Sequence, residues 1–343
     1  MKAIVYEKPG SAILADLPMP VCGDNDIIIK VMSASICKGA DLRHHNKGHA
    51  LGKYPITTGH EFAGYVYETG KNVERCKPGD RVTADNALPC GNCYYCRIGK
   101  HTQCDHMGAI GHNIPGGFAQ YVKVPESNIY LLPDKVSFNE GCLTEPVACC
   151  MHAMDRLNVQ YGEDVLVFGA GPNGIIISQM VKHSSAENVV ALASTQSKLD
   201  ILQGYGIQTQ LIDRDNPQMH KEALNRIFPR GVDAIVDATG SASVLEDAVQ
   251  FLKKGGRLLQ YSSSPDDSAM TISPSYFYRN ELQYYTSYCQ TYTFGRAVAT
   301  IASGKVKVKD LVTAEYSLEE FFRAIEDVKD RNVLKLIIHP NKD

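Results

Sequence analysis

The sequence predicts an α/β protein that combines an irregular β domain with a parallel, doubly wound sheet. The first 150 residues hold short β-type runs between glycine turns, for example at residues 27–31 and 64–68. From about residue 164, strand-like and helix-like segments alternate, which is typical of a parallel sheet covered by helices. A length of 343 residues allows each part its own core.

The individual elements follow from these two patterns. In the first part, Pro78 and Gly79 mark a turn that leads into a strand near Val82. The second part is predicted to have strands at 165–169, 189–193, 210–212, 234–237 and 255–259, and helices at 173–183, 198–203, 217–227 and 243–253. The tail reads as an amphipathic helix at 317–331 and a strand at 333–339 that returns to the first domain. We therefore expect one domain from residues 1–150 and 290–343, and a second from residues 151–289.

Composition excludes several classes of protein. A formal net charge of -3 favours neither nucleic acid nor an anionic membrane as a partner. No apolar run is long enough for a membrane span, and the first residues lack the apolar core of a signal peptide. Eleven cysteines, an odd number, fit free thiols and bound metal in a reducing compartment. A cytoplasmic location is the expectation.

Four cysteines stand at metal-binding spacing. Residues 90–104 read CGNCYYCRIGKHTQC and contain Cys90, Cys93, Cys96 and Cys104. Four thiolates spaced in this way can close tetrahedrally around one zinc ion. Because a site ligated only by protein has no open position for a substrate, this zinc is predicted to be structural.

A glycine-rich turn predicts a dinucleotide site. The string GAGPNG follows an apolar run and supplies Gly169, Gly171, Pro172, Asn173 and Gly174. Glycines between a strand and a helix let backbone N–H groups approach a pyrophosphate, and the helix N-terminus adds partial positive charge. The alternative is a tight turn without a ligand.

The end of the next strand predicts which cofactor is used. Enzymes that use NAD place a carboxylate there for the ribose 2′-hydroxyl group, but this chain has Ala193. Ser194, Thr195 and Lys198 follow and could donate to a 2′-phosphate. The sequence therefore favours NADP(H) over NAD(H). In the alternative, the hydroxyl groups only cap the next helix and NAD is used loosely.

A second metal group is predicted from Cys37, His60, Glu61 and Glu145. Cysteine, histidine and carboxylate ligands can hold zinc and leave a place for water or an alcohol oxygen. Such a zinc makes an alcohol more acidic and so prepares it for hydride transfer. Taken alone, Cys37 is more simply explained as a core residue, and His60 and Glu61 as a surface pair at a turn. Together with the cysteine cluster and the glycine turn, these residues indicate a catalytic zinc.

At these residues the chain resembles the zinc-containing medium-chain dehydrogenase/reductase superfamily over nearly its full length. The resemblance implies a GroES-like catalytic domain, a Rossmann cofactor domain and assembly into dimers or tetramers. The stretch TEPVACCMHA at residues 144–153 is similar to the polyol dehydrogenase branch, which includes D-arabinitol, sorbitol and xylitol dehydrogenases. By that similarity Cys37, His60 and Glu61 bind the catalytic zinc, and Glu145 is a fourth ligand or a partner of the zinc-bound water.

We expect a zinc-dependent oxidoreductase that interconverts a polyol, either a pentitol such as D-arabinitol or a hexitol, with a ketose. One departure concerns the proton relay: where the family has Cys-x-Ser/Thr-Asp, Cys37 is followed by Lys-Gly-Ala-Asp, without a hydroxyl group. His44, His45, Thr58 or Glu145 could substitute. Alternatives are a sugar-alcohol phosphate dehydrogenase, with Lys38, Arg43, Lys47 and Arg279 as candidate phosphate ligands, and a non-enzymatic binding protein of the same fold.

Overall fold

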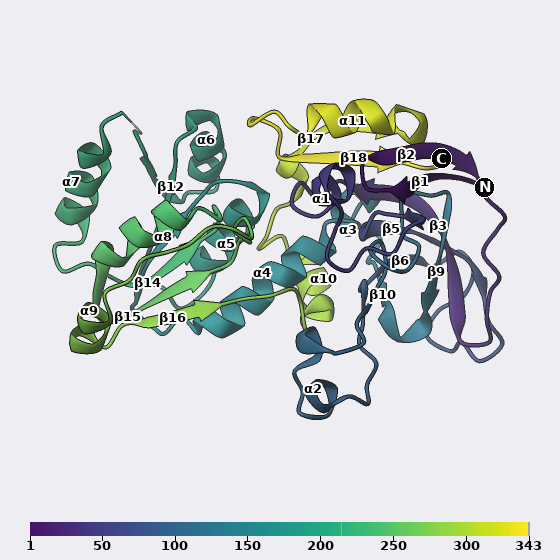
Figure 1. The fold of residues 1–343 in the computed structure, drawn as a ribbon, viewed down its shortest axis with the longest axis horizontal. Helices are drawn as coiled ribbons and strands as arrows, with labels where there is room; N and C mark the ends of the chain where they lie inside the picture. The colour runs from purple at the N-terminus through teal and green to yellow at the C-terminus, as the bar shows by residue number, and fades with distance from the viewer. Residues whose placement is uncertain (214, 342–343) are drawn as a thin grey trace. The chain divides into compact units, whose positions relative to one another are not determined.

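The computed structural model describes residues 1–213 and 215–341, which divide into two compact units (Figure 1). The first unit consists of Met1–Ala148, Gln290–Gly304 and Val308–Asp343. The second consists of Cys149–Cys289 and Lys305–Lys307. None of the helices in the described ranges has the length and apolar character needed to cross a bilayer.

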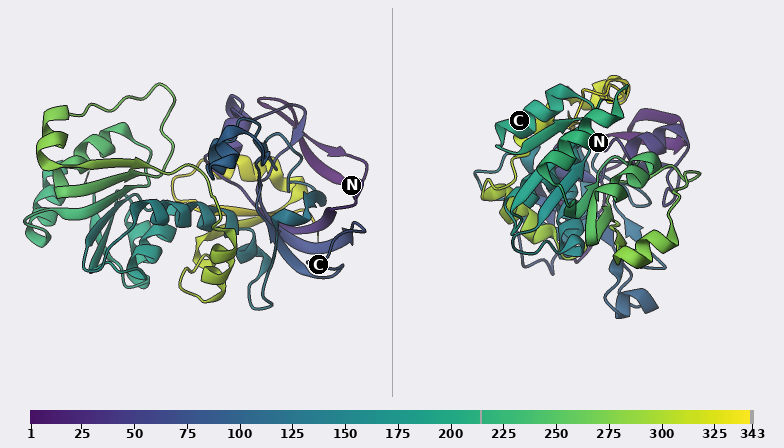
Figure 2. Two further views of the ribbon diagram at one scale, coloured as in Figure 1. Left: turned by 90° about the horizontal axis from the view of Figure 1, so that it is seen from below. Right: turned by 90° about the vertical axis from the view of Figure 1, so that its left-hand side faces the viewer.

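Two antiparallel-rich sheets form most of the first unit. The smaller has the order β2-β1-β4, and the larger has the order β10-β6-β5-β3-β18-β17 with β9 also paired to β3. Their strands are β1 (Lys2–Lys8), β2 (Ser11–Asp16), β3 (Asp26–Ser35), β4 (Ile56–Thr57), β5 (Glu61–Thr69), β6 (Arg81–Ala84), β9 (Tyr121–Pro125), β10 (Ile129–Leu131), β17 (Val312–Ser317) and β18 (Lys335–His339). Because β18 pairs with β3, the end of the chain completes a sheet begun near its start (Figure 2).

Short elements complete the first unit. The helices are α1 (Asp41–Asn46), α2 (Tyr94–Arg97), α3 (Phe138–Gly141), α10 (Phe294–Ala302) and α11 (Phe321–Asp327), and a small hairpin pairs β7 (Ala87–Leu88) with β8 (Gly108–Ala109). Single 3₁₀ turns lie at His101–Gln103, Glu126–Asn128, Lys309–Leu311 and Leu318–Glu320. The boundary between the units falls within α4 (Thr144–Leu157).

The second unit contains the predicted parallel sheet. Its order is β13-β12-β11-β14-β15-β16, and every pairing is parallel. The strands are β11 (Asp164–Phe168), β12 (Asn188–Ala193), β13 (Gln208–Leu211), β14 (Val232–Asp237), β15 (Leu252–Gln260) and β16 (Gln283–Thr286); the helices are α5 (Pro172–Lys182), α6 (Gln196–Gly204), α7 (Pro217–Ile227), α8 (Ala242–Ala248) and α9 (Pro274–Asn280). This order reverses between β11 and β14, as in doubly wound dinucleotide-binding folds. The α/β fold class predicted from the sequence is confirmed.

Two predicted helices are shorter than expected. The helix predicted at 243–253 ends with α8, a 3₁₀ turn at Val249–Phe251 follows, and β15 already begins at Leu252. The helix predicted at 317–331 starts with a 3₁₀ turn and is α-helical only over Phe321–Asp327. In both cases most of the hydrophobic positions are buried as expected, with Phe322 an exposed exception, but part of the segment reaches the core in a different backbone conformation.

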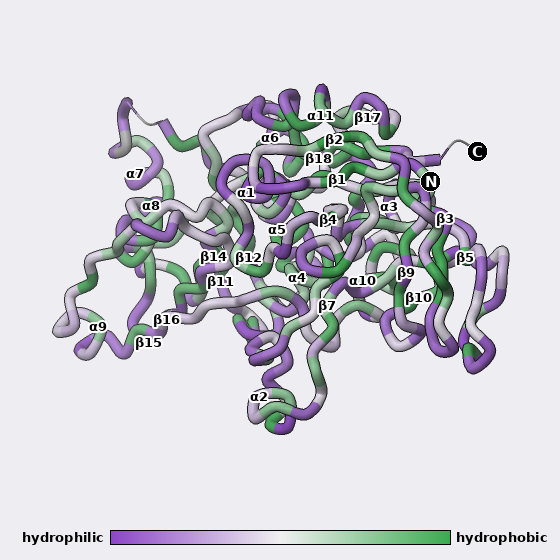
Figure 3. Tube along the Cα trace, turned by 45° about the vertical axis from the view of Figure 1, so that its right-hand side comes forward, coloured by the Kyte–Doolittle hydropathy of each residue, from purple (hydrophilic) through white to green (hydrophobic). Residues whose placement is uncertain are grey.

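Each unit has its own hydrophobic core. In the first unit Phe62, Phe118 and Phe321 are fully buried, and the rings of Phe118 and Phe321 lie 4.9 Å apart. In the second unit Leu166 and Ile235 lie in a buried cluster at the centre of the sheet. Figure 3 colours the chain by hydropathy; along β9, for example, Val122 and Val124 are buried in this core while Lys123 between them is exposed.

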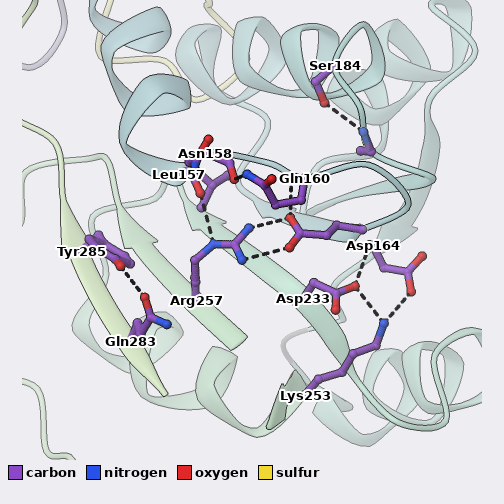
Figure 4. Close-up of polar contacts among 12 residues, drawn as sticks. Leu157, Asn158, Gln160, Asp164, Ser184, Asp233, Lys253, Arg257, Gln283 and Tyr285 are labelled. Carbon is purple, nitrogen blue, oxygen red and sulfur yellow. Dashed lines mark hydrogen bonds and ion pairs between the residues drawn. The ribbon is translucent and has the colours of Figure 1, made fainter. Parts of the chain in front are cut away.

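Ion pairs tie β15 to the segment that begins β11 (Figure 4). The Arg257 guanidinium donates to both carboxylate oxygens of Glu163, at 2.9 and 2.5 Å, and to the carbonyl oxygen of Leu157 at 3.1 Å. Lys253 donates to Asp164 and Asp233 at 3.0 and 2.8 Å. Burial alone raises the pKa of Glu163, but the hydrogen bonds and charge of Arg257 outweigh it and lower that pKa.

Replacement of Arg257 is therefore expected to destabilise the protein. Arg257→Ala should lower the free energy of unfolding by about 2–4 kcal/mol, because Glu163 and the Leu157 carbonyl lose their charged donor. The loss should shrink in acid, since a carboxylate with a lowered pKa contributes stability above its usual pKa, and this contribution disappears as the pH falls through the folded-state pKa. Urea unfolding followed by circular dichroism measures both effects.

Arg323→Ala is the matched control, because its side chain is 71% exposed and pairs with Asp327 on the surface. An exposed pair of this kind contributes at most about 1 kcal/mol. Equal destabilisation by the two substitutions would contradict the importance given to the Arg257 contacts.

Candidate functional site

The four cysteines predicted to form a structural site come together in one lobe of the first unit. The sulfur atoms of Cys90, Cys93, Cys96 and Cys104 lie within 4.8 Å of one another. Cys93 precedes α2 and Cys96 lies on it, while the backbone N–H groups of Cys90 and His106 each donate to the Cys104 sulfur at 3.3 Å. Backbone N–H donors also lower the pKa of Cys93 to about 6. Clustered thiols with N–H donors suit a zinc ion, which binds thiolates.

Strand pairing brings together a second candidate group. In the β3–β5 ladder, Ser35 lies opposite Glu61. Cys37, just after β3, therefore lies close to His60 and Glu61 at the start of β5, and one ligand atom from each of these three lies within 4.8 Å of the others. His60 is 4% exposed and Glu61 is 1% exposed.

A buried lysine that the sequence reasoning missed contacts this group. The Lys335 ammonium, at the start of β18, donates to both Glu61 oxygens at 2.6 Å, and its side chain is only 5% exposed. Burial disfavours the charged ammonium, but the charges of Glu61, Cys37 and Glu145 raise the pKa of Lys335 well above its usual value. A lone lysine inside the apolar run VLKLII was the only signal available in the sequence.

Glu145 and Asp41 add negative charge. Glu145 lies in the first turn of α4, is buried, and is outside the three-residue ligand group, although its charge acts on His60. The Asp41 carboxylate accepts the N–H of Cys37 at 2.8 Å, and burial raises its pKa to about 6.

The electrostatics of the group favour a bound cation. Burial opposes protonation of His60, but its hydrogen bond with Cys37 and the charges of Cys37, Glu145 and Asp41 raise its pKa to about 10. His60 Nδ1 and Asp41 Oδ1 are buried without a hydrogen-bond partner among the described residues. Cysteine, histidine and carboxylate donors together with excess negative charge suit a divalent zinc ion.

The histidines considered for a proton relay have different surroundings. His44 is completely buried, and its Nδ1 lies 2.8 Å from the Tyr54 hydroxyl group. His45 is half-buried, with Nδ1 3.4 Å from the Tyr6 hydroxyl group. Thr58 is also buried. A solvent-exposed loop is therefore not the environment of His44.

The glycine turn of the second unit has the backbone that the sequence predicts. Gly169 has a φ of +105°, and a Cβ on Gly174 would lie 1.9 Å from the Gly169 carbonyl oxygen, so a side chain at Gly174 is excluded. Gly171 is the N-cap of α5, with open space beside it, and Pro172 begins the helix. Asn173 Oδ1 is buried without a hydrogen-bond partner among the described residues. An open helix N-terminus without a side-chain cap suits a phosphate group.

The predicted cofactor-selecting residues lie together at the end of β12. Ala193 is the last residue of the strand, Ser194 is exposed, and Thr195 is the N-cap of α6. The Thr195 side chain makes no capping hydrogen bond. Lys198 lies in the first turn of the same helix. The residues thus form a short polar surface without a carboxylate.

Comparison with known proteins gives consistent results for both units. Residues 23–134 match the alcohol dehydrogenase GroES-like domain, and residues 172–303 match the zinc-binding dehydrogenase family. D-arabinitol dehydrogenase 1 of Uromyces fabae is 31% identical, over 99% of this chain and 97% of its own. Sorbitol dehydrogenase of Bacillus subtilis (strain 168) is 29% identical, over 100% of this chain and 98% of its own.

A solved structure has the same fold. A zinc-binding dehydrogenase from Sinorhizobium meliloti 1021, bound to NADP, superposes with a TM-score of 0.92 at 26% identity and covers 99% of both chains. The shared fold, the two family matches and the full-length relatives confirm the resemblance inferred from the sequence. The chain belongs to the zinc-containing medium-chain dehydrogenase/reductase superfamily, in its polyol dehydrogenase branch.

Proposed function

We propose that the protein transfers hydride between a secondary alcohol of a polyol and NAD(P), with NADP(H) as the favoured cofactor, and so interconverts a polyol and a ketose. The observation that carries this proposal is the convergence of Cys37, His60 and Glu61 in a buried, negatively charged group. The names of the relatives, D-arabinitol dehydrogenase and sorbitol dehydrogenase, support a pentitol or hexitol as the substrate class.

The proposed metal ligands are Cys37, His60 and Glu61, with Glu145 as a fourth ligand or as the partner of a water molecule. When bound there, zinc acidifies an alcohol hydroxyl group and polarises a ketone. Lys335 neutralises part of the Glu61 charge and keeps that carboxylate at the group. The Asp41 carboxylate holds the backbone of Cys37 in place through its N–H.

Glu145 is the proposed proton acceptor. Gly39 and Ala40 have no hydroxyl group to carry a proton away from Cys37. Glu145 is buried and lies close enough for its charge to raise the pKa of both His60 and Lys335. A carboxylate in this place can accept the alcohol proton directly or through water.

The cofactor is proposed to bind the second unit at the carboxyl ends of β11 and β12. The N-terminus of α5, from Gly171 to Gly174, takes the pyrophosphate. Ser194, Thr195 and Lys198 take the 2′-phosphate of NADP, and the absence of a carboxylate at Ala193 leaves that phosphate unopposed.

A phosphorylated polyol is less well supported as the substrate. One relative is D-arabitol-phosphate dehydrogenase of Enterococcus avium, at 29% identity. The Lys38 ammonium, a candidate phosphate ligand, instead donates to the carbonyl oxygens of Lys329 and Asp330 at 3.4 and 3.2 Å. Because this lysine is already engaged, a neutral polyol fits better. A non-enzymatic role does not account for the complete set of metal-ligand candidates.

We also propose that the protein forms homodimers or homotetramers. In the described sheet of the second unit, β16 is an edge strand, and most of its residues are exposed. An exposed edge strand presents unpaired backbone groups that can pair with a second copy.

Metal content is expected to be two zinc ions per chain in protein purified without added metal. Cys37→Ala should remove one ion and abolish activity while leaving the fold intact. Cys93→Ala should remove the other ion and lower the thermal unfolding temperature, because four thiolates hold that lobe together. Elemental analysis of freshly purified protein measures both; one zinc or none in the unmodified protein would contradict the assignment.

Substrate and cofactor choice can be tested in one steady-state screen of pentitols, hexitols, their phosphates and the matching ketoses with NAD and NADP. We expect a higher kcat/KM with NADP and a neutral polyol. Ala193→Asp should shift the preference toward NAD by about tenfold or more, since a carboxylate repels the 2′-phosphate, and tenfold corresponds to about 1.4 kcal/mol. A higher kcat/KM with NAD in the unmodified enzyme would show that the residues at the end of β12 do not select NADP.

The proton step is tested by Glu145→Gln, which keeps the size of the side chain but not its basicity. It should lower kcat by at least about 100-fold, the scale of losing a positioned acid–base group, while zinc content stays at two. His45→Ala should change kcat much less. If Glu145→Gln instead removes zinc, Glu145 is chiefly a ligand; if kcat stays normal, the proton leaves by another route.

A further inference from the structure

Three histidines form a second cluster in the first unit, apart from the Cys37, His60 and Glu61 group. His44 lies on α1, His49 in the coil between α1 and β4, and His112 just after β8. One ring nitrogen from each lies within 4.8 Å of the others. His44 is completely buried, His112 is 7% exposed and His49 is half-buried.

The backbone builds this cluster through close glycine packing. Gly111 has a φ of +83°, and a Cβ there would lie 2.7 Å from the Gly59 carbonyl carbon, so no larger residue fits. This contact sets the neighbouring His112 ring against the His60 ring, with centroids 4.7 Å apart. His44, on α1, also lies against His112, with ring centroids 5.3 Å apart.

We propose that His44, His49 and His112 bind a divalent transition-metal ion of the imidazole-preferring kind, such as Zn²⁺. His44 Nε2 and His112 Nδ1 are 3.1 Å apart. Two nitrogens on one tetrahedral zinc are about 3.3 Å apart, given Zn–N distances of about 2.0–2.1 Å. The two nitrogens are within hydrogen-bonding distance of each other, and an ion that replaces this contact needs only a small increase in their separation.

Two of the three ring spacings agree with a shared ion, although the rings are stacked, with interplanar angles of 17–23°. Two imidazoles on one tetrahedral ion have centroids about 5 Å apart, from the same Zn–N distance. The His44 centroid is 5.0 Å from that of His49 and 5.3 Å from that of His112. His49 and His112 are closer, at 4.3 Å, so His49 must move outward as an ion enters. Its position in a half-buried coil permits that movement.

Hydrogen bonds at the other ring nitrogens orient the ligands. His44 Nδ1 lies 2.8 Å from the Tyr54 hydroxyl group, which also accepts the N–H of His49 at 3.3 Å. His49 Nδ1 accepts the N–H of Leu51 at 3.2 Å, so its Nε2 is the nitrogen left for a metal. Partners at the second nitrogen are a usual feature of metal-binding histidines, because they set the tautomer and the ring direction.

The three side chains are imidazoles, the commonest protein ligands of such an ion. Neutral imidazoles bind metal without first losing a proton. Three protein ligands also leave a fourth position open for water or a hydroxyl group.

The neighbouring charges tolerate an additional cation. Around His60, the acidic side chains are Cys37, Asp41, Glu61 and Glu145, and Lys335 is the buried base. One divalent ion at the Cys37 group together with Lys335 does not exceed the negative charge of four ionised acids. Arg43 adds one positive charge near His49, so the surroundings of a second divalent ion are close to neutral in charge.

Metal binding beyond the first two ions tests the proposal. The full-length protein, purified without added metal and holding its two zinc ions, is dialysed against Co²⁺, and bound zinc and cobalt per chain are counted by elemental analysis alongside an absorption spectrum. We expect one additional ion in the unmodified protein, without the thiolate-to-cobalt charge-transfer band that a cysteine site gives. His49→Gln should lose that additional ion and keep the other two.

His45→Gln is the matched control, since His45 is adjacent in sequence to His44 but contacts Tyr6 and lies outside the cluster. It should bind the additional ion as the unmodified protein does. The proposal is overturned if the unmodified protein takes up no additional ion, or if His49→Gln binds as many ions as His45→Gln. Either result leaves the proposed dehydrogenase activity standing, because the zinc ions at the two cysteine-containing groups are counted separately and the activity is tested by the steady-state screen.

Discussion

The buried pair between Glu61 and Lys335 is the interaction on which the rest of the first unit depends. Alone, either charge would be costly at this depth, because an unpaired buried ion loses its water without compensation. Together they let a carboxylate stay beside Cys37 and His60 with almost no exposure. The pair also joins β5 to β18, so the same contact that supplies a candidate metal ligand holds the sheet to its C-terminal strand.

Features with short sequence spacing were predictable from the sequence. The cysteine lobe and the glycine turn each lie within a few residues, so spacing alone indicates their geometry. The parallel sheet was also predictable, since its strands and helices alternate regularly. The ends of α8 and α11 were not, because the same hydrophobic positions can be buried by a helix, a 3₁₀ turn or the start of a strand.

The missed site residues share one property: tertiary pairing decides their place. Lys335 is 274 residues from Glu61, and His112 is 68 residues from His44. Residues separated by so much sequence form no local motif that spacing could reveal. The convergence of Cys37 with His60 was predicted from the ligand chemistry of the residues and from the resemblance, whereas the structure explains it through the ladder pair of Ser35 and Glu61. The pairing register of strands that lie far apart in the sequence cannot be derived from a single sequence.

The discontinuous first unit has a consequence for the order in which the chain is made. On the ribosome, domains generally fold as they emerge, with the N-terminal one first. Here the segment Cys149–Cys289 is continuous and can fold as soon as it leaves the exit tunnel. Residues 1–148 must wait, because Glu61 has no ammonium partner until Lys335, 274 residues further along the chain, has been synthesised. The part of the protein made first is therefore the part completed last.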